Sequence, residues 1–94
     1  MRLTFEWDEG KARENLRKHK VSFEEAKTVF GDAFLVTFPD LEHSESEERY
    51  VSVGISSKGR LLVVTHTERG RNVRVINARK ATASERKVYE EGGL

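Results

Sequence analysis

The second half of the sequence contains three strand-like segments joined by connections of only a few residues, and this restricts the fold more than any other feature. Residues 50–56 and 72–78 alternate between apolar and polar side chains, and residues 61–64 are apolar on both faces. Turn-forming residues separate them at 57–59 and 68–71. Strands joined by such short turns run antiparallel, so the sequence predicts an antiparallel meander.

Helices are predicted before and after these strands. Asp8 is a candidate N-cap for a first helix, whose narrow apolar stripe includes Leu16. Ser22 and Glu25 fit the capping box that begins a second helix. Another capping box, at residues 82–85, begins a short helix near the C-terminus.

Two further strand-like segments, residues 2–7 and 33–38, lie in the first half of the chain. The predicted order of elements is therefore β-α-α-β-β-β-β-α. This order indicates the α+β class, with an antiparallel meander sheet, two N-terminal helices packed on one face and a short C-terminal helix. Ninety-four residues, of which 36% are hydrophobic, provide one core, so we expect a single domain over residues 1–94.

Charged residues are distributed unevenly along the chain. The net charge is +1, but residues 1–50 contain 8 Lys/Arg and 12 Asp/Glu, whereas residues 51–94 contain 9 and 4. A basic half suits an RNA-phosphate surface, because cations that bind the strand release its condensed counterions. A solvated surface with unevenly scattered ions explains the same distribution about as well.

Cysteine is absent, which excludes a disulfide framework and a thiol nucleophile. His19, His43 and His66 lie far apart in sequence and none belongs to a metal-ligand pattern, so no metal or other cofactor is expected. The sequence shows no signal segment and no apolar run near 18 residues. The expected location is the cytoplasm, without membrane contact.

Motifs at the two ends of the chain point to a known family. The opening motif consists of Phe5-Glu6-Trp7-Asp8, Lys11, Asn15 and Lys18-His19, and the closing motif of Arg74-Val75-Ile76-Asn77-Ala78-Arg79-Lys80-Ala81-Thr82, Glu85-Arg86 and Tyr89. Together they resemble the BrnT family, the toxin half of a bacterial type II toxin–antitoxin pair. The resemblance covers nearly the whole chain.

This resemblance implies a RelE-like fold and an endoribonuclease that cleaves RNA and inhibits translation. It also implies a cognate antitoxin of the ribbon-helix-helix type, similar to BrnA, in a 2:2 complex that silences the toxin. DNA would then be contacted only through the antitoxin.

RNA cleavage without a metal needs a base for the 2′-hydroxyl, cations for the charge that develops on the phosphate, and an acid for the departing 5′-oxygen. The best cationic cluster is Arg74, on the last predicted strand, together with Arg79 and Lys80, at the junction between that strand and the C-terminal helix. Guanidinium groups bind phosphate bidentately. We therefore expect these three residues to act in catalysis, although ordinary surface cations would look the same.

Two further catalytic candidates each have a structural alternative. Glu85 is a possible general base and is also the third helical residue of the predicted C-terminal capping box, which is the safer interpretation. His66 is a possible acid or base near neutral pH, but a single histidine in a strand is more often a packing residue.

Candidate RNA-binding residues lie in both motifs and beside them. They are Lys11, Lys18, His19, Arg49 and Tyr89. Lys11 and Lys18 are seven residues apart and share a helical face. Residues 40–48 are acidic and are expected to form a loop, and Arg49 matches the arginine that follows the corresponding loop in this family. Tyr89 and Trp7 are possible stacking platforms for bases, but Trp7 alternates in register with apolar neighbours and belongs more naturally to the core.

The sequence departs from the family pattern at two positions. Lys20 replaces the glycine that usually follows the Lys-His pair, which predicts a wider or strained turn. Asn77 replaces a serine in the closing strand, so any role of that hydroxyl is in doubt.

Two other classes of function remain open. An interaction protein without nuclease activity would use the basic half to hold an acidic segment of the antitoxin. A DNA-binding regulator would use the two N-terminal helices, but Glu14, Glu24 and Glu25 interrupt the basic face that a recognition helix needs.

Overall fold

The computed structural model describes residues 2–43 and 47–92, and the expected order of elements is present in this part of the chain. A 3-10 turn, η1, is added after the second helix. The elements are β1 (Thr4–Glu6), α1 (Glu9–His19), α2 (Phe23–Lys27), η1 (Thr28–Gly31), β2 (Val36–Pro39), β3 (Arg49–Ile55), β4 (Leu61–Arg69), β5 (Asn72–Lys80) and α3 (Ala83–Glu90).

The strands form one mixed sheet in the order β1-β5-β4-β3-β2. The successive strands β2 to β5 pair antiparallel. β1 instead pairs parallel with β5, from Thr4 opposite Asn72 to Glu6 opposite Arg74. The prediction of an antiparallel meander therefore does not hold for the whole sheet. The turn-length argument applied only to strands that follow each other, and β1 is separated from β5 by most of the chain.

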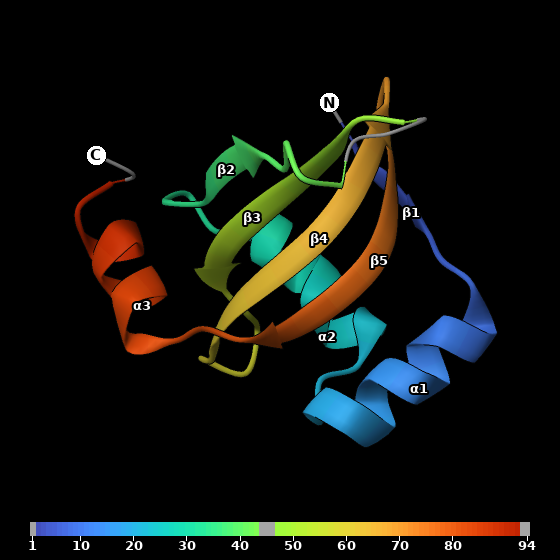
Figure 1. The fold of residues 1–94 in the computed structure, drawn as a ribbon, viewed down its shortest axis with the longest axis horizontal. Coiled ribbons are helices and arrows are strands. Elements are labelled where there is room, and N and C mark those ends of the chain that lie inside the picture. Colours follow the sequence, from blue (N-terminus) through green and yellow to red (C-terminus); the bar gives the residue numbers. More distant parts are fainter. Residues whose placement is uncertain (1, 44–46, 93–94) are drawn as a thin grey trace.

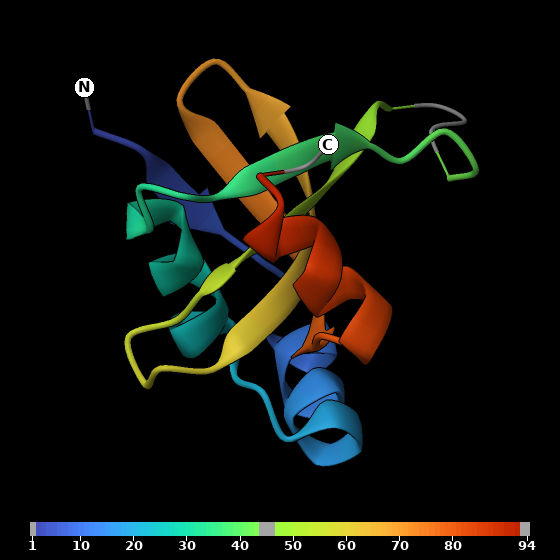
Figure 2. The same ribbon diagram turned by 90° about the vertical axis from the view of Figure 1, so that its left-hand side faces the viewer.

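Helices cover both faces of this sheet (Figures 1 and 2). On one face, α2 and η1 pack on the apolar side chains of β4 and β5, and α1 lies against β5. The residues of this larger core are Val21, Phe23, Ala26, Val29, Leu62, Val64, Val75 and Ala78. On the other face, Tyr89 of α3 packs on a smaller cluster of Val53, Leu61 and Val63. The C-terminal helix thus lies on the face opposite the two N-terminal helices.

A β-bulge decides which side chains of β5 point toward each face. Thr65 pairs with Asn77 and His66 pairs with Val75, so Ile76 has no partner in β4. Strict alternation along β5 would place Arg74 and Arg79 on opposite faces, but the unpaired residue shifts the alternation by one position. As a result, Arg74, Asn77 and Arg79 all lie on the α3 face of the sheet.

The first helix is attached by a polar side chain rather than by its apolar stripe. Asp8 caps it as expected, accepting a bond from the backbone of Lys11 at 2.8 Å. Leu16, which was expected to pack, is 49% exposed. Asn15 is buried instead, and its Nδ2 donates to the carbonyls of Val21 at 2.9 Å and Ala78 at 2.8 Å. Its Oδ1 accepts from the Ala78 amide, so this side chain satisfies the edge of β5 beyond β1.

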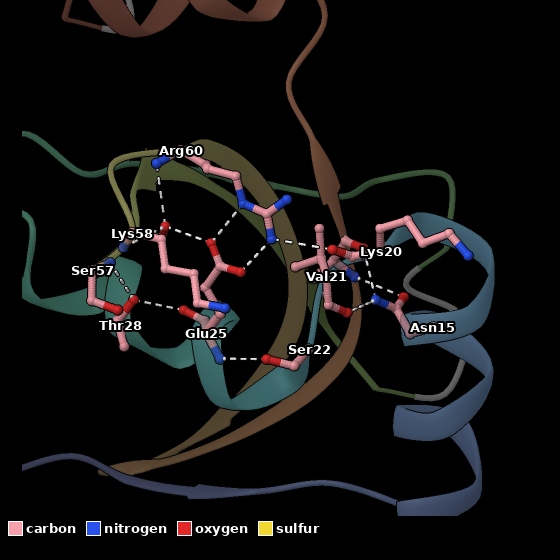
Figure 3. A network of polar contacts seen from close by, with 11 residues as sticks. Asn15, Lys20, Val21, Ser22, Glu25, Thr28, Ser57, Lys58 and Arg60 are labelled. Atoms are coloured by element: carbon pink, nitrogen blue, oxygen red, sulfur yellow. Dashed lines mark hydrogen bonds and ion pairs between the residues drawn. The ribbon is translucent and has the colours of Figure 1, made fainter.

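The second helix has only half of its expected capping box. Ser22 Oγ accepts from the Glu25 amide at 3.0 Å. The Glu25 carboxylate, however, bonds to Arg60 and to Ser56 Oγ, in a network that Figure 3 shows around Arg60. Arg60 also donates to the carbonyl of Lys20 at 3.1 Å. Its hydrogen bonds hold the pKa of Glu25 below the ordinary value, so this buried carboxylate stays charged and ties α2 to the β3–β4 turn.

Candidate functional site

A shallow hollow of about 340 Å³ opens where α1, the β2–β3 loop and three strands meet. It is lined by Lys11, His43, Glu47, Arg49, Thr67, Arg74 and Ile76. Three of these seven side chains are cations from different parts of the sequence, so the fold concentrates positive charge here.

Cross-strand pairing brings the two arginines of the hollow together. Arg49 at the start of β3 lies opposite Thr67 of β4, and Thr67 lies opposite Arg74 of β5. The three residues therefore form one row on the α3 face of the sheet. Thr67 is buried between the arginines. Lys11, in the first turns of α1, completes the set from beside β5.

The hollow continues in both directions along β5. A neighbouring depression shares Lys11 and Ile76 with it and extends along α1 to Lys18 and His19. A second shares Thr67 and Arg74 and extends toward Glu6, Arg69 and Asn72. We call the three depressions together the basic groove. Four predicted RNA-binding residues, Lys11, Lys18, His19 and Arg49, line it together with Arg74, which was predicted to be catalytic.

Ion pairs hold some of the groove cations in place. Arg74 Nη1 lies 2.7 Å from Glu6 Oε2, and Arg69 Nη2 lies 3.1 Å from Glu47 Oε2. Hydrogen bonds from Asn72 and Arg74 lower the pKa of Glu6. Among the described residues, no carboxylate lies within ion-pair distance of the Lys11 or Lys18 ammonium groups. Exposed ion pairs contribute little free energy, so a phosphate can compete for these arginines.

The structure separates Arg79 and Glu85 from the groove. Arg79 lies opposite Val63, about 13 Å along β4 from the row of Arg74 at the usual strand rise. Its guanidinium forms two bonds of 2.8 and 2.7 Å to the Glu85 carboxylate. Glu85 also completes the capping box with Thr82, as expected. Hydrogen bonding to Arg79 lowers the pKa of Glu85 to about 2, which makes it a poor proton acceptor.

His66 lies outside the groove, so its position does not favour the catalytic role that was predicted for it. It is fully buried on the face of the sheet that α2 and η1 cover, where its ring lies 4.9 Å from that of Phe30. Its Nε2 lies 2.7 Å from Ser52 Oγ, and its Nδ1 lies 3.4 Å from Glu68 Oε2 without forming a hydrogen bond to any described residue. Burial lowers the pKa of His66 to about 4, so the imidazole is neutral at physiological pH and out of reach of a substrate.

Two other predicted site residues also lie elsewhere. The Tyr89 hydroxyl donates to Asp32 Oδ2 at 2.6 Å, an interaction that raises its pKa to about 12, and the ring packs on the core beneath α3. Figure 1 shows α3 on the side of the molecule away from α1. Lys80 also lies outside the groove. It pairs with Leu62, whose side chain belongs to the larger core under α2 and η1. Trp7 packs edge-on against Phe23 at 5.9 Å, in agreement with its expected place in the core.

One groove residue carried no role in the sequence interpretation. His43 Nδ1 lies 3.1 and 3.2 Å from the two carboxylate oxygens of Asp40, and the imidazole lines the hollow with Lys11, Arg49 and Arg74. In a helix, an Asp and a His three residues apart lie on the same face and can contact each other. In a loop, the same spacing predicts no contact between the two side chains. No sequence signal therefore singled out this pair.

Residues 2–43 and 47–92 contain neither a metal-binding cluster nor a membrane-spanning helix. No group of three or more His, Cys, Asp or Glu lies close enough together to bind a metal ion. No helix in this part of the chain has the length and apolar character to cross a membrane.

Comparisons with known proteins give the chain its family. The family model described as "Ribonuclease toxin, BrnT, of type II toxin-antitoxin system" matches residues 7–85. The crystal structure of the Brucella abortus ribonuclease toxin BrnT superimposes with a TM-score of 0.66 at 22% identity, covering 85% of this chain and 97% of that one. At this identity the structural match shows a shared fold. No curated protein matches the sequence. The family match extends over more than three quarters of the chain, which therefore belongs to the BrnT family of type II ribonuclease toxins.

Proposed function

We propose that this protein is an endoribonuclease that cleaves RNA without a metal ion and binds the strand along the basic groove. The observation that carries the proposal is the convergence of Lys11, Arg49 and Arg74 on one hollow. These residues come from α1, β3 and β5, and only the tertiary fold brings them together. Cations held by a rigid sheet are preorganised to meet charge that develops on a phosphate.

The groove provides the main electrostatic component of such a reaction. In a transesterification, the 2′-oxygen attacks the neighbouring phosphorus and negative charge grows on the non-bridging oxygens. Arg49 and Arg74 flank Thr67, so their guanidinium groups suit a phosphate placed between them. Lys11 and Lys18 extend the positive surface along α1 for the adjoining backbone.

The wider biological role follows from the family and belongs to the same proposal. A ribonuclease toxin of a type II system acts on RNA and has an antitoxin partner. We propose inhibition of translation in the cytoplasm, a RelE-like relationship of the fold, and a BrnA-like ribbon-helix-helix antitoxin in a 2:2 complex. The size and open surface of the groove are compatible with a strand or an antitoxin segment.

The alternative of a partner-binding module has one specific observation in its favour. Glu6 and Glu47 form ion pairs with Arg74 and Arg69, so carboxylates of the chain itself already pair with arginines of the groove. An acidic antitoxin segment would fit there without any RNA cleavage. The DNA-binding alternative is weaker, because α2 has five residues and its Phe23, Glu25 and Ala26 are buried, which leaves no recognition helix for a DNA groove.

Cleavage of RNA by the purified full chain in excess EDTA tests the proposal. We expect shortened RNA with 2′,3′-cyclic phosphate and 5′-hydroxyl ends. Cleavage that requires added magnesium would overturn the metal-independent mechanism. Soluble, folded protein that binds RNA or antitoxin but never cleaves would favour the partner-binding module.

Substitution of Arg74 assigns the activity to the groove. Arg74→Ala should lower the cleavage rate by roughly 10²- to 10³-fold, the usual effect of losing one preorganised donor. The matched control is Arg71→Ala, which removes an exposed arginine from the β4–β5 turn, outside the groove. Equal rates for the two variants would place the activity elsewhere.

A further inference from the structure

The basic groove contains an imidazole that is oriented by a carboxylate. His43 uses Nδ1 to contact both oxygens of Asp40, at 3.2 and 3.1 Å. The other ring nitrogen, Nε2, therefore points away from Asp40. The His43 side chain is 61% exposed, whereas that of Asp40 is 17% exposed. The carboxylate is thus the enclosed partner and the imidazole the accessible one.

The sheet fixes the carboxylate beneath this imidazole. Asp40 directly follows β2, and its amide donates to the carbonyl of Arg49 at 2.7 Å, at the start of β3. The same hydrogen bond places Asp40 next to a strand that contributes a groove cation. His43 is therefore held near the row of Arg49, Thr67 and Arg74 although it lies in a loop.

Other candidate proton carriers are occupied or remote. His66 is buried on the opposite face of the sheet, and Glu85 is held by two hydrogen bonds from Arg79. The Tyr89 hydroxyl is bonded to Asp32 under α3. The residues that line the central hollow include one further side chain that could accept a proton, Glu47, and it forms an ion pair with Arg69 at 3.1 Å. His43 is the group there that combines an exposed side chain with a ring nitrogen turned away from its carboxylate partner.

We infer that His43 is the general base of the reaction, positioned by Asp40, an inference that rests on the proposed ribonuclease activity. Nε2 takes the proton of the 2′-hydroxyl as the 2′-oxygen forms a bond to phosphorus. The bond from phosphorus to the 5′-oxygen breaks, and water supplies the proton to that oxygen. The imidazolium then returns its proton to solvent. The products are a 2′,3′-cyclic phosphate and a 5′-hydroxyl, with Lys11, Arg49 and Arg74 facing the charged phosphate.

Substitution of His43 in the full chain tests this role. His43→Ala should lower the cleavage rate 10²- to 10⁴-fold, the usual range for one proton-transfer group. Its melting temperature should stay within about 1–2 °C of the wild-type value, because the side chain is exposed. Its affinity for a non-cleavable 2′-O-methyl RNA should stay within about twofold of the wild-type affinity. Free imidazole in the buffer should restore part of the lost rate, which a merely structural role would not allow.

Control variants separate this inference from its alternatives. Arg71→Ala removes an exposed side chain of the β4–β5 turn, outside the groove, and should retain nearly the full rate. Glu47→Gln should cleave far faster than His43→Ala, and the reverse order would make Glu47 the base. Asp40→Asn should lower kcat and leave KM unchanged, because it disturbs the orientation of the imidazole and not the binding surface.

The outcomes for the activity and for His43 are distinguishable. Wild-type protein that does not cleave RNA overturns the proposed function, and this inference with it. Wild-type cleavage that His43→Ala matches overturns only the role of His43. Loss of activity in His43→Ala without any rescue by imidazole, together with loss of RNA binding, would reassign the residue to binding.

Discussion

At the scale of single residues, the partner of an arginine distinguishes a binding group from a structural one. Arg74 has one half-exposed carboxylate partner, Glu6, beside an open groove. Arg79 has both of its terminal nitrogens bonded to Glu85 and one of them also directed to the Lys80 carbonyl. A phosphate that replaced Glu85 would also break the cap of α3. Arg79 therefore holds the C-terminal helix to the end of β5.

The Arg79–Glu85 pair should show coupling in a double-mutant cycle of unfolding free energies. We expect Arg79→Ala and Glu85→Ala each to destabilise the protein, and the two effects to overlap by about 1 kcal/mol, since the bidentate pair is only partly shielded from solvent. Glu85→Ala should cost about 1 kcal/mol more through the lost cap. Additive losses of stability, combined with a cleavage defect in Arg79→Ala alone, would support the catalytic role that the sequence predicted for Arg79.

Burial of His66 should make the protein less stable in mild acid. The imidazole takes up a proton near pH 6.5 when unfolded and only near pH 4 when folded. Between these values the unfolded chain binds more protons, so stability is complete above pH 6.5 and is lost as the pH falls toward 4. The expected loss between pH 7 and pH 5 is on the order of 2 kcal/mol.

Urea unfolding at pH 7 and pH 5 measures this effect. His66→Gln, which does not titrate, should lose most of the pH dependence whatever its absolute stability. His19→Gln is the control, because His19 is partly exposed at the end of α1, and it should behave as the wild type. An unchanged pH dependence in His66→Gln would show that other groups dominate acid unfolding.

At the scale of elements, the turn between α1 and α2 uses a residue that is poorly suited to its backbone conformation. Lys20 has φ 60° and ψ 31°, the left-handed region, and is the only non-glycine residue with positive φ among those described. Its amide donates to Leu16 at 3.0 Å, which ends α1 as a helix C-cap. The departure from the usual glycine therefore leaves the turn tight, and the strain is local to Lys20.

Lys20→Gly should stabilise the protein. The left-handed conformation costs a residue with a side chain roughly 1–2 kcal/mol, and the greater freedom of unfolded glycine offsets part of that gain. A net gain of about 1 kcal/mol would raise the melting temperature by roughly 4–8 °C for a domain of this size. Lys18→Gly, two residues earlier in the helix, should instead lower it. A lower melting temperature for Lys20→Gly would mean that the bond from its Nζ to Arg17 outweighs the strain.

Local patterns in the sequence predicted most elements but not their lengths or all their partners. Asp8 and Thr82 cap their helices because capping depends on residues three apart. β4 continues to Arg69, well past the apolar segment that predicted it, because backbone pairing with β3 and β5 extends beyond the core. Neither the parallel position of β1 nor the bulge at Ile76 has a local signal.

The candidate site was predictable only as far as the motifs reached. Lys11 and Arg74 belong to the two motifs, Arg49 matches a family position between them, and the fold brings the three to one hollow. Arg79 lies on the same face of the sheet, but the sequence did not reveal that its charge is directed to Glu85. His43 was missed because its place depends on the path of the loop that carries it.

At the scale of the whole molecule, the two oppositely charged halves of the sequence bind each other. Three arginines of the basic half contact three glutamates of the acidic half: Arg60 with Glu25, Arg69 with Glu47 and Arg74 with Glu6. Several charges of the basic half are thus paired with charges of the acidic half inside the fold. The positive surface offered to RNA is the groove, to which the acidic half itself contributes Lys11, Lys18 and Arg49.

The salt dependence of RNA binding distinguishes the groove from a generally basic half. Each phosphate contact on a single strand contributes about −0.7 to the slope of log K against log salt. Contacts from Lys11, Arg49 and Arg74 predict a slope of about −2, or a loss of about 16-fold between 50 and 200 mM salt. A 2′-O-methyl RNA allows binding to be measured without cleavage. Arg74→Ala should reduce the slope by about 0.7, and Arg71→Ala should not change it. A slope near −6 that both substitutions reduce equally would show that the strand follows the cations of the basic half as a whole, because nine contacts would then replace three.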